Sequence, residues 1–301
     1  MTSAEQLLDE IKQGNFLSIA RALTIVENEL SQSDEILRAL SSLNSTEVIG
    51  ITGPPGAGKS TLVSAIISQL RLEDKKIAVL AVDPTSPFNL GSLLGDRVRM
   101  SSHFNHPNIF IRSVAARGSL GGLSAKIIEM IDVLRASIFD YIIVETVGVG
   151  QSEIEIAGLA DKTIVLLVPE SGDEIQHLKS GLMEIADAFI VNKSDREGAD
   201  GFANTLIKVL HGRTEVVPVF KTVAHQGIGI EGVVDWITNE TTTSKRKLDL
   251  YAEKAFKLIQ QIRVKDISKK DLLKQLGQQQ KNPEFNLYCF VQDYLASKRK
   301  I

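Results

Sequence analysis

Residues 48–61 read VIGITGPPGAGKST, and this stretch decides the fold. A short run of β-branched apolar residues enters a glycine-rich turn, and apolar residues at helical spacing follow the turn. Residues 53–60 fit G-x-x-x-x-G-K-S, the spacing of a phosphate-binding loop, which requires a strand before it and a helix after it. The stretch therefore predicts an α/β fold that binds a nucleoside triphosphate.

Each part of this loop has a physical role toward phosphate. Its glycines let successive backbone N–H groups turn toward an anion without a Cβ in the way. The helix that begins near Lys59 brings the positive end of its dipole to the phosphates. Lys59 places a charge at the β- and γ-phosphates, and the Ser60 hydroxyl can ligate Mg²⁺. The predicted nucleotide-binding residues here are Gly53, Pro54, Pro55, Gly56, Ala57, Gly58, Lys59, Ser60 and Thr61.

Composition narrows the class of protein. The chain has 301 residues, of which 43% are hydrophobic and 24% charged, as in an ordinary globular protein. The single cysteine, Cys289, excludes a disulfide framework and a thiolate metal site. No apolar run approaches the length of a membrane span, and the acidic start of the chain does not resemble a targeting signal. We expect a cytoplasmic protein with no membrane partner.

The net charge of −3 is unevenly distributed. Residues 241–301 carry a net charge of +8, and residues 1–240 carry −11. A basic tail can bind nucleic acid or an acidic partner, but few aromatic residues are interleaved with these lysines and arginines. A solvated helical face is the better interpretation, so we expect no nucleic-acid partner.

Periodicity divides the chain into three parts. Residues 4–43 have helical spacing, with breaks at Gly14 and Asn15 and again at 31–34, where Ser33 or Asp34 would be the N-cap. From residue 48 onward, strands alternate with helices, which predicts a mostly parallel sheet with helices on both faces. The predicted strands are 48–52, 76–82, 109–114, 140–145, 163–168, 188–192 and 215–220.

The expected architecture is a P-loop NTPase domain over residues 45–240. An N-terminal helical extension (1–44) precedes the domain, and a C-terminal helical region (241–301) follows it.

A second motif indicates which base is bound. Residues 189–195 read FIVNKSD, an apolar strand that ends in N-K-x-D. The Asp195 carboxylate can accept two parallel hydrogen bonds from N1–H and the amino group of guanine, which adenine does not offer. Asn192 can bond the opposite edge of the base, and the stem of Lys193 can lie along the ring. After a phosphate loop, this motif predicts guanine specificity.

Another guanine loop is predicted after the last strand of the sheet. Residues 222–224 read TVA and follow the apolar run 216–220. A backbone N–H at this position would meet the O6 atom of guanine. The predicted contributors are Thr222, Val223 and Ala224.

Metal and switch residues are predicted between the two nucleotide motifs. Residues 140–148 read DYIIVETVG, a strand that ends in a carboxylate three residues before a glycine. Glu145 can hold Mg²⁺ through water, and the Gly148 N–H can sense the γ-phosphate. A glutamine that orients the attacking water often follows such a glycine, but this chain has Val149. We therefore expect slow hydrolysis unless a partner completes the site.

Other loops offer further acidic and basic groups. Asp83 and Asp96 are hypotheses for the Mg²⁺ shell or its water network. Arg97, Arg99 and Arg117 could neutralise transition-state charge, and nothing in the sequence ranks them. The predicted catalytic residues are Lys59, Asp83, Asp96 and Glu145, and the predicted metal-binding residues are Ser60, Asp96 and Glu145.

With these motifs, the chain resembles a known family, the MeaB/ArgK family of P-loop GTPases. The resemblance covers residues 15–240, and its most specific element is ETVGVGQSE at 145–153. The other matching segments are residues 20–28, 53–61, 82–86, 91–97, 117–123, 172–176 with Lys179, 183–187 and 192–195. Residues 87–90, which read PFNL, depart from the small, glycine-containing stretch of the family, and residues 241–301 match only in being helical.

The resemblance implies a function and a partner. Members act as GTP-dependent chaperones of adenosylcobalamin-dependent methylmalonyl-CoA mutase and its relatives, delivering or protecting a cofactor that belongs to the mutase. The resemblance also implies a homodimer, Mg²⁺ bound with GTP or GDP, and a mobile switch at residues 169–179 that faces the partner. Asp83, Asp96 and Glu145 would then serve the Mg²⁺ and hydrolysis machinery.

Two alternatives are less well supported by the sequence. A nickel-insertion GTPase shares this fold, but it would use a Cys/His relay or a His-rich tract. This chain has one cysteine and five scattered histidines, at positions 103, 106, 177, 211 and 225. A kinase or a nucleotide-binding module that does not hydrolyse is the other alternative. No phosphoacceptor site is readable, and N-K-x-D disfavours ATP.

Overall fold

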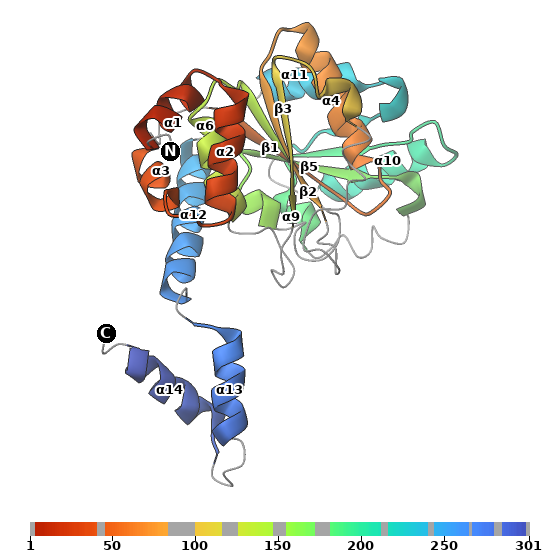
Figure 1. The fold of residues 1–301 in the computed structure, drawn as a ribbon. Helices are drawn as coiled ribbons and strands as arrows, with labels where there is room; N and C mark the ends of the chain where they lie inside the picture. Colours follow the sequence, from red (N-terminus) through yellow and green to blue (C-terminus); the bar gives the residue numbers. More distant parts are fainter. Residues whose placement is uncertain are drawn as a thin grey trace. The chain divides into compact units, whose positions relative to one another are not determined.

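A seven-stranded parallel sheet forms the centre of the protein. The computed structural model describes residues 4–40, 46–83, 100–115, 126–146, 155–171, 181–211, 216–239, 244–264, 267–279 and 285–298. The chain divides into two compact units, Met1–Lys254 and Ala255–Ile301, and the sheet lies in the first (Figure 1). Its strand order is β3-β2-β4-β1-β5-β6-β7, and every neighbouring pair is parallel.

The strands follow the predicted pattern closely. They are β1 (Glu47–Thr52), β2 (Ile77–Asp83), β3 (Ile109–Ala115), β4 (Tyr141–Glu145), β5 (Lys162–Leu167), β6 (Ala188–Val191) and β7 (Val219–Lys221). The predicted α/β fold with a mostly parallel sheet is thus confirmed. β5 is buried at every position, as expected for a central strand covered on both faces.

The prediction for the last strand was wrong at its start. We expected residues 215–220, but β7 begins at Val219, and Val216 is 98% exposed. Pro218 has no N–H to donate to a ladder, which ends regular pairing at that residue. Its carbonyl still accepts a hydrogen bond from the Phe189 N–H at 2.9 Å.

Helices cover both faces of the sheet. On one face, α4 (Lys59–Leu72) and α11 (Ile230–Asn239) pack on side chains such as Ile49, Ile143 and Ile164. On the other face, α10 (Ala199–Leu210) and α9 (Leu182–Ile185) cover β5 and β6. The rest of that face, over β2, β4 and β1, is covered by α6 (Lys126–Arg135).

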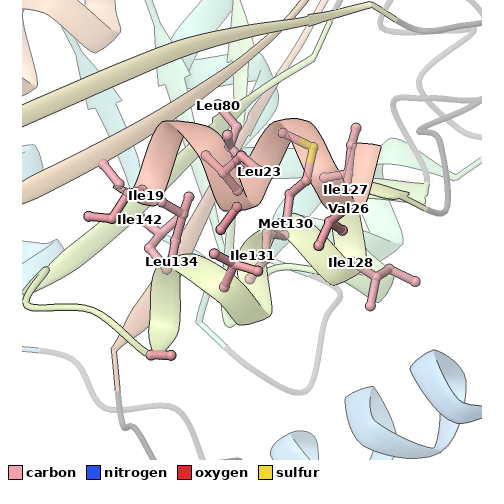
Figure 2. Packing of buried hydrophobic residues seen from close by; sticks show 14 of the residues in the cluster. Ile19, Leu23, Val26, Leu80, Ile127, Ile128, Met130, Ile131, Leu134 and Ile142 are labelled. Atoms are coloured by element: carbon pink, nitrogen blue, oxygen red, sulfur yellow. The ribbon is translucent and has the colours of Figure 1, made fainter. Parts of the chain in front are cut away.

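The N-terminal helices belong to the same core. They are α1 (Ala4–Lys12), α2 (Phe16–Glu27) and α3 (Ser33–Ala39), and they gather beside α6 in Figure 1. Figure 2 shows Leu23 of α2 among the apolar side chains of α6, with Leu80 and Ile142 of the sheet nearby. The sequence predicts a helical prelude of this kind, and its apolar side chains pack on α6 and on the sheet.

Of the two predictions for the helix ends in this segment, one is confirmed and one is wrong. The predicted break at Gly14 and Asn15 separates α1 from α2. Asn15 is the N-cap of α2, and its side chain accepts hydrogen bonds from the N–H groups of Leu17 and Ser18. The expected N-cap of α3 at Ser33 or Asp34 was wrong, because Gln32 is the cap and Ser33 is the first helical residue. The Ser33 N–H instead donates to the Leu30 carbonyl in the preceding turn.

Short 3₁₀ helices connect several of the larger elements. They are η1 (Ser101–His103), η2 (Ile156–Gly158), η3 (Pro169–Ser171) and η5 (Ala224–Gln226). Because all strands are parallel, the loops after β1, β4, β6 and β7 leave the same edge of the sheet. The predicted nucleotide motifs lie in these loops.

The second unit is helical. α12 (Ser244–Val264) runs across the boundary between the units, and α13 (Lys269–Gln279) and α14 (Leu287–Lys298) follow. Among the helices that the structure describes, none is both long enough and apolar enough to span a membrane.

Candidate nucleotide-binding site

The phosphate loop connects β1 to α4, and two of its glycines are required by close contacts. Gly53 has φ +143°, and a Cβ there would lie 2.1 Å from the Leu166 carbonyl oxygen. Gly58 has φ +96°, and its Cβ would lie 2.6 Å from Nδ2 of Asn192. Any side chain at either position would displace a neighbouring strand or loop, so this backbone path requires glycine.

Lys59, the first residue of α4, folds back along its own loop. Its Nζ donates to the carbonyl oxygens of Gly53 at 2.9 Å and Pro54 at 3.1 Å. The side chain is only 6% exposed. An ammonium has three N–H donors, so Lys59 can hold the loop in shape while it presents charge to a phosphate.

The predicted metal-binding pair meets across the sheet edge. Ser60 Oγ of α4 donates to Glu145 Oε1 at the end of β4, over 2.7 Å. Both side chains are buried, at 2% and 3% exposure. A hydroxyl and a carboxylate are hard oxygen ligands of the kind that Mg²⁺ prefers, usually together with phosphate oxygens and water. The residues therefore fit Mg²⁺ bound with a nucleotide.

No protein cage for a metal accompanies this pair. Within the described parts of the chain, no group of three or more His, Cys, Asp and Glu side chains is placed to hold a metal ion. That is compatible with Mg²⁺, which retains several waters and is commonly bound through one or two protein ligands.

A second hydroxyl pair lies next to the metal-binding residues. Thr146 Oγ1 donates to Thr52 Oγ1 at 3.0 Å, and the Thr146 N–H donates to the Ile51 carbonyl at 3.0 Å. Both threonines are buried. The sequence motifs assign no role to either residue, although Thr52 directly precedes the phosphate loop and Thr146 directly follows Glu145.

Asn192 joins three loops. Its Nδ2 donates to the Ala57 carbonyl of the phosphate loop at 2.8 Å. Its Oδ1 accepts from Thr222 Oγ1 and from the Ala224 N–H, each at 3.1 Å. These bonds use both acceptor positions and one of the two N–H donors of the amide. The side chain is 3% exposed, and in this arrangement it fixes the loops to one another.

The other three residues of the N-K-x-D motif differ in their contacts and exposure. Lys193 has φ +56°, and its Nζ donates to the Gly56 carbonyl at 2.8 Å. Ser194, to which the motif assigns no role, donates from both its N–H and its hydroxyl to the Thr222 carbonyl. Asp195 is exposed. Its carboxylate is the group of this motif that is accessible to a base.

The amides of residues 222–224 already have protein acceptors. The Thr222 N–H donates to Val191, the Val223 N–H donates to Ile228, and the Ala224 N–H donates to Asn192. A backbone contact from Ala224 to guanine O6 would therefore have to replace its bond to Asn192.

An exposed ion pair links η3 to the loop after β6, which contains the N-K-x-D motif. Arg196, directly after Asp195, contacts Glu170 of η3 through NH1 and Oε1. The hydrogen bond from Arg196 lowers the pKa of the Glu170 carboxyl. The predicted switch at 169–179 begins at η3, and its residues 172–179 lie outside the described part of the chain.

His103 of η1 packs on α4 behind the phosphate loop. Its Nε2 lies 3.0 Å from Ser64 Oγ and 3.2 Å from the Ser64 carbonyl. Burial lowers the pKa of this imidazole, an effect partly offset by the hydrogen bond with Ser64. At neutral pH, His103 is therefore an uncharged anchor between η1 and α4.

The remaining predicted residues are not placed in the site. Asp83 is the last residue of β2, and Asp96 and Gly148 lie outside the described residues. Val149 and the three candidate arginines, Arg97, Arg99 and Arg117, also lie outside the described residues. Their assignments stay predictions.

The described groups suit one class of chemistry. Lys59 lies in a glycine-rich loop of the kind that binds an anion, the Ser60–Glu145 oxygen pair can serve a divalent cation, and the exposed Asp195 carboxylate can read a base. Such groups bind and orient a nucleoside triphosphate, and phosphoryl transfer depends mainly on this positioning and charge stabilisation.

Comparison with known proteins agrees with this geometry. Residues 19–281 match the family described as methylmalonyl-CoA mutase-associated GTPase MeaB. A putative GTPase of Pyrococcus horikoshii is 49% identical over 201 residues, which cover 66% of this chain and 63% of that protein. The fused isobutyryl-CoA mutase of Cupriavidus metallidurans is 35% identical over 233 residues, 73% of this chain and 21% of the mutase.

A solved structure extends the similarity to the fold. The crystal structure of a LAO/AO transport system kinase superposes with a TM-score of 0.70 at 27% identity, covering 99% of this chain and 92% of that one. The match with the Pyrococcus protein leaves more than a third of that relative uncovered. Because the family match spans most of the sequence and the site carries its motifs, the chain belongs to the MeaB family of P-loop GTPases.

Proposed function

We propose that this GTPase is a switch protein that assists an adenosylcobalamin-dependent acyl-CoA mutase. It would hydrolyse GTP to GDP and phosphate while the mutase is loaded with its cofactor, protected or reactivated. Adenosylcobalamin would belong to the partner and would not be held stably by this chain.

One observation carries the choice of partner. A segment 35% identical to 73% of this chain occurs within a protein named fused isobutyryl-CoA mutase. The family description, which names methylmalonyl-CoA mutase, points to the same class of enzyme. We infer that the client is an acyl-CoA mutase.

The described site supports a hydrolysing switch. Lys59 and the loop amides bind and orient the phosphates, and Ser60 and Glu145 would hold Mg²⁺. When bound, Mg²⁺ supplies charge neutralisation at the β- and γ-phosphate oxygens. Glu145 ends β4, Thr146 follows it directly before the sequence VGVG, and we propose that this sequence responds to the γ-phosphate.

The sequence of the switch supports slow basal turnover. Position 149 is a valine, whose side chain can neither accept nor donate a hydrogen bond to the attacking water. We propose that the client completes the active site and thereby couples hydrolysis to docking.

We further propose a homodimer that forms through the C-terminal helical region, residues 241–301. In the second unit, α14 exposes Leu287, Val291 and Leu295, which recur every four residues and therefore share one stripe. α12 exposes Phe256 and Ile262 in the same unit. Exposed large apolar side chains that gather on one surface are typical of a protein interface.

GTP turnover by the purified protein, alone and with methylmalonyl-CoA or isobutyryl-CoA mutase, tests the proposed function. We expect slow basal hydrolysis that a mutase accelerates at least about tenfold, a barrier change of about 1.4 kcal/mol. Lys59→Ala is the control, and it should remain inactive with or without mutase. Turnover that neither mutase changes, in protein that binds GTP normally, would contradict the partner assignment and leave the GTPase intact.

A further inference from the structure

The backbone at the end of β4 is held by its neighbour β1. The two strands are parallel, with Ile51 opposite Glu145. One residue further on, the Thr146 N–H donates to the Ile51 carbonyl at 3.0 Å. The chain thus stays paired with β1 up to the point where the segment 147–154 begins.

Glu145 and Thr146 point to opposite faces of the sheet. Side chains alternate along a strand, and the preceding residues show the assignment, since Ile143 packs with α4 whereas Val144 packs with α6. Glu145 accordingly reaches Ser60 of α4. Thr146 turns the other way and meets Thr52.

The Thr52–Thr146 bond is well protected. The two hydroxyl oxygens lie 3.0 Å apart, and the residues are 0% and 2% exposed. Water therefore does not compete for the bond, and loss of one hydroxyl would leave the other without this partner. Because Thr52 precedes Gly53, the bond joins the entrance of the phosphate loop to the entrance of the 147–154 segment.

We propose that Thr146 is a positioning residue for the metal site. Its hydroxyl, held by Thr52, fixes the end of β4 so that the Glu145 carboxylate stays within reach of Ser60 and of Mg²⁺ bound there. Thr146 does not touch the nucleotide or the metal. The proposal rests on the assignment of Ser60 and Glu145 to Mg²⁺ and is independent of which mutase is the client.

The test is the affinity for a non-hydrolysable GTP analogue, measured in Mg²⁺ and again in EDTA. The ratio of the two dissociation constants gives the benefit that Mg²⁺ confers, and it does not depend on turnover. In Thr146→Val, which keeps the shape of the side chain, this benefit should fall about fivefold or more, as expected for one lost hydrogen bond. The affinity in EDTA should stay at the wild-type value.

Four further variants make the test specific. Thr146→Ser, which keeps the hydroxyl, should restore the Mg²⁺ benefit. Thr52→Val should lower it as Thr146→Val does, and the double variant should lower it no further. Thr163→Val is the matched control, because Thr163 is also fully buried in a strand and its hydroxyl has no hydrogen-bond partner among the described residues.

Different outcomes would contradict the positioning role of Thr146 and the assignment of Ser60 and Glu145 to Mg²⁺. A normal Mg²⁺ benefit in Thr146→Val, or an equal loss in Thr146→Ser or Thr163→Val, would overturn the positioning role while the metal site stands. Wild-type protein whose analogue affinity does not respond to Mg²⁺ would overturn the metal assignment and the positioning role with it.

Discussion

Asn192 connects more loops than any assignment from the motif alone suggests. The N-K-x-D pattern identified it as a residue that bonds the base, yet its amide binds Ala57, Thr222 and Ala224 within the protein. Motif spacing predicts which residues come together at a sheet edge. It does not predict which of several polar partners a side chain selects, because that depends on loops distant in sequence.

Asn192→Ala should destabilise the protein even without nucleotide. Three buried hydrogen bonds are lost, and their partners stay buried, so the free energy of unfolding should fall by about 2–4 kcal/mol. Asp195→Ala is the matched control, since its exposed carboxylate makes little contribution to stability, about 0.5 kcal/mol or less. Urea denaturation of both apo-proteins measures the difference. Equal stability of the two variants would contradict the bridging role of Asn192.

At the scale of single elements, the apolar patterns were the most predictive feature. β6 is apolar at all four positions and β5 at its last four, and both strands are buried on both faces. The same reasoning failed at residues 216–218, because two valines before Pro218 resemble a strand, but the strand that follows them is at the edge of the sheet. An edge strand pairs on one side only, so a proline there decides where pairing begins.

The packing of α2 on α6 should be essential to stability. Leu23 is fully buried between α6 and the sheet, so Leu23→Ala should cost about 2–5 kcal/mol of unfolding free energy. Leu17 lies on the same helix but is 83% exposed, and Leu17→Ala should change stability by about 0.5 kcal/mol or less. Denaturant titration distinguishes the two. A loss of unfolding free energy in Leu23→Ala as small as that in Leu17→Ala would contradict the packing of α2 on α6.

The contact of η1 with α4 should make stability depend on pH through His103. Its pKa in the folded protein lies below the unfolded value, so the unfolded state binds more protons as the pH falls below about 6.5. The stability that this neutral imidazole preserves is therefore fully present above that pH and declines as the pH is lowered.

His103→Gln should reduce the loss of stability between pH 7 and pH 5 relative to the wild type. His225→Gln, at an exposed position, should retain the wild-type pH dependence. Thermal unfolding at several pH values gives both curves. A His103 variant with an unchanged pH dependence would show that its burial is not coupled to protonation.

At the scale of the whole molecule, the sequence predicted the strands of the sheet but not the exposed apolar side chains of the C-terminal helices. The charge of +8 in residues 241–301 suggested a solvated face, but the described helices there also expose Tyr288 and Leu273 at 80% and 73%. A helix that packs on a partner has the same periodicity as one that packs on its own core. The difference becomes visible only when the rest of the fold is known.

Substitution of the apolar stripe of α14 should separate the subunits of the proposed homodimer. Val291→Asp places an unpaired charge in the stripe, so light scattering coupled to gel filtration should change from the mass of a dimer to that of a monomer. Val216→Asp is the control, at a position in the first unit that is 98% exposed. A Val291 variant that keeps the dimer mass would place the interface elsewhere.

The most direct test of the guanine-nucleotide site is the affinity of the purified protein for GDP compared with ADP, measured by calorimetry in Mg²⁺. The Asp195 carboxylate can accept two hydrogen bonds from guanine and none of that pair from adenine, so GDP should bind at least about 100-fold more tightly. GDP and ADP of equal affinity would contradict the assignment of residues 192–195 to base recognition.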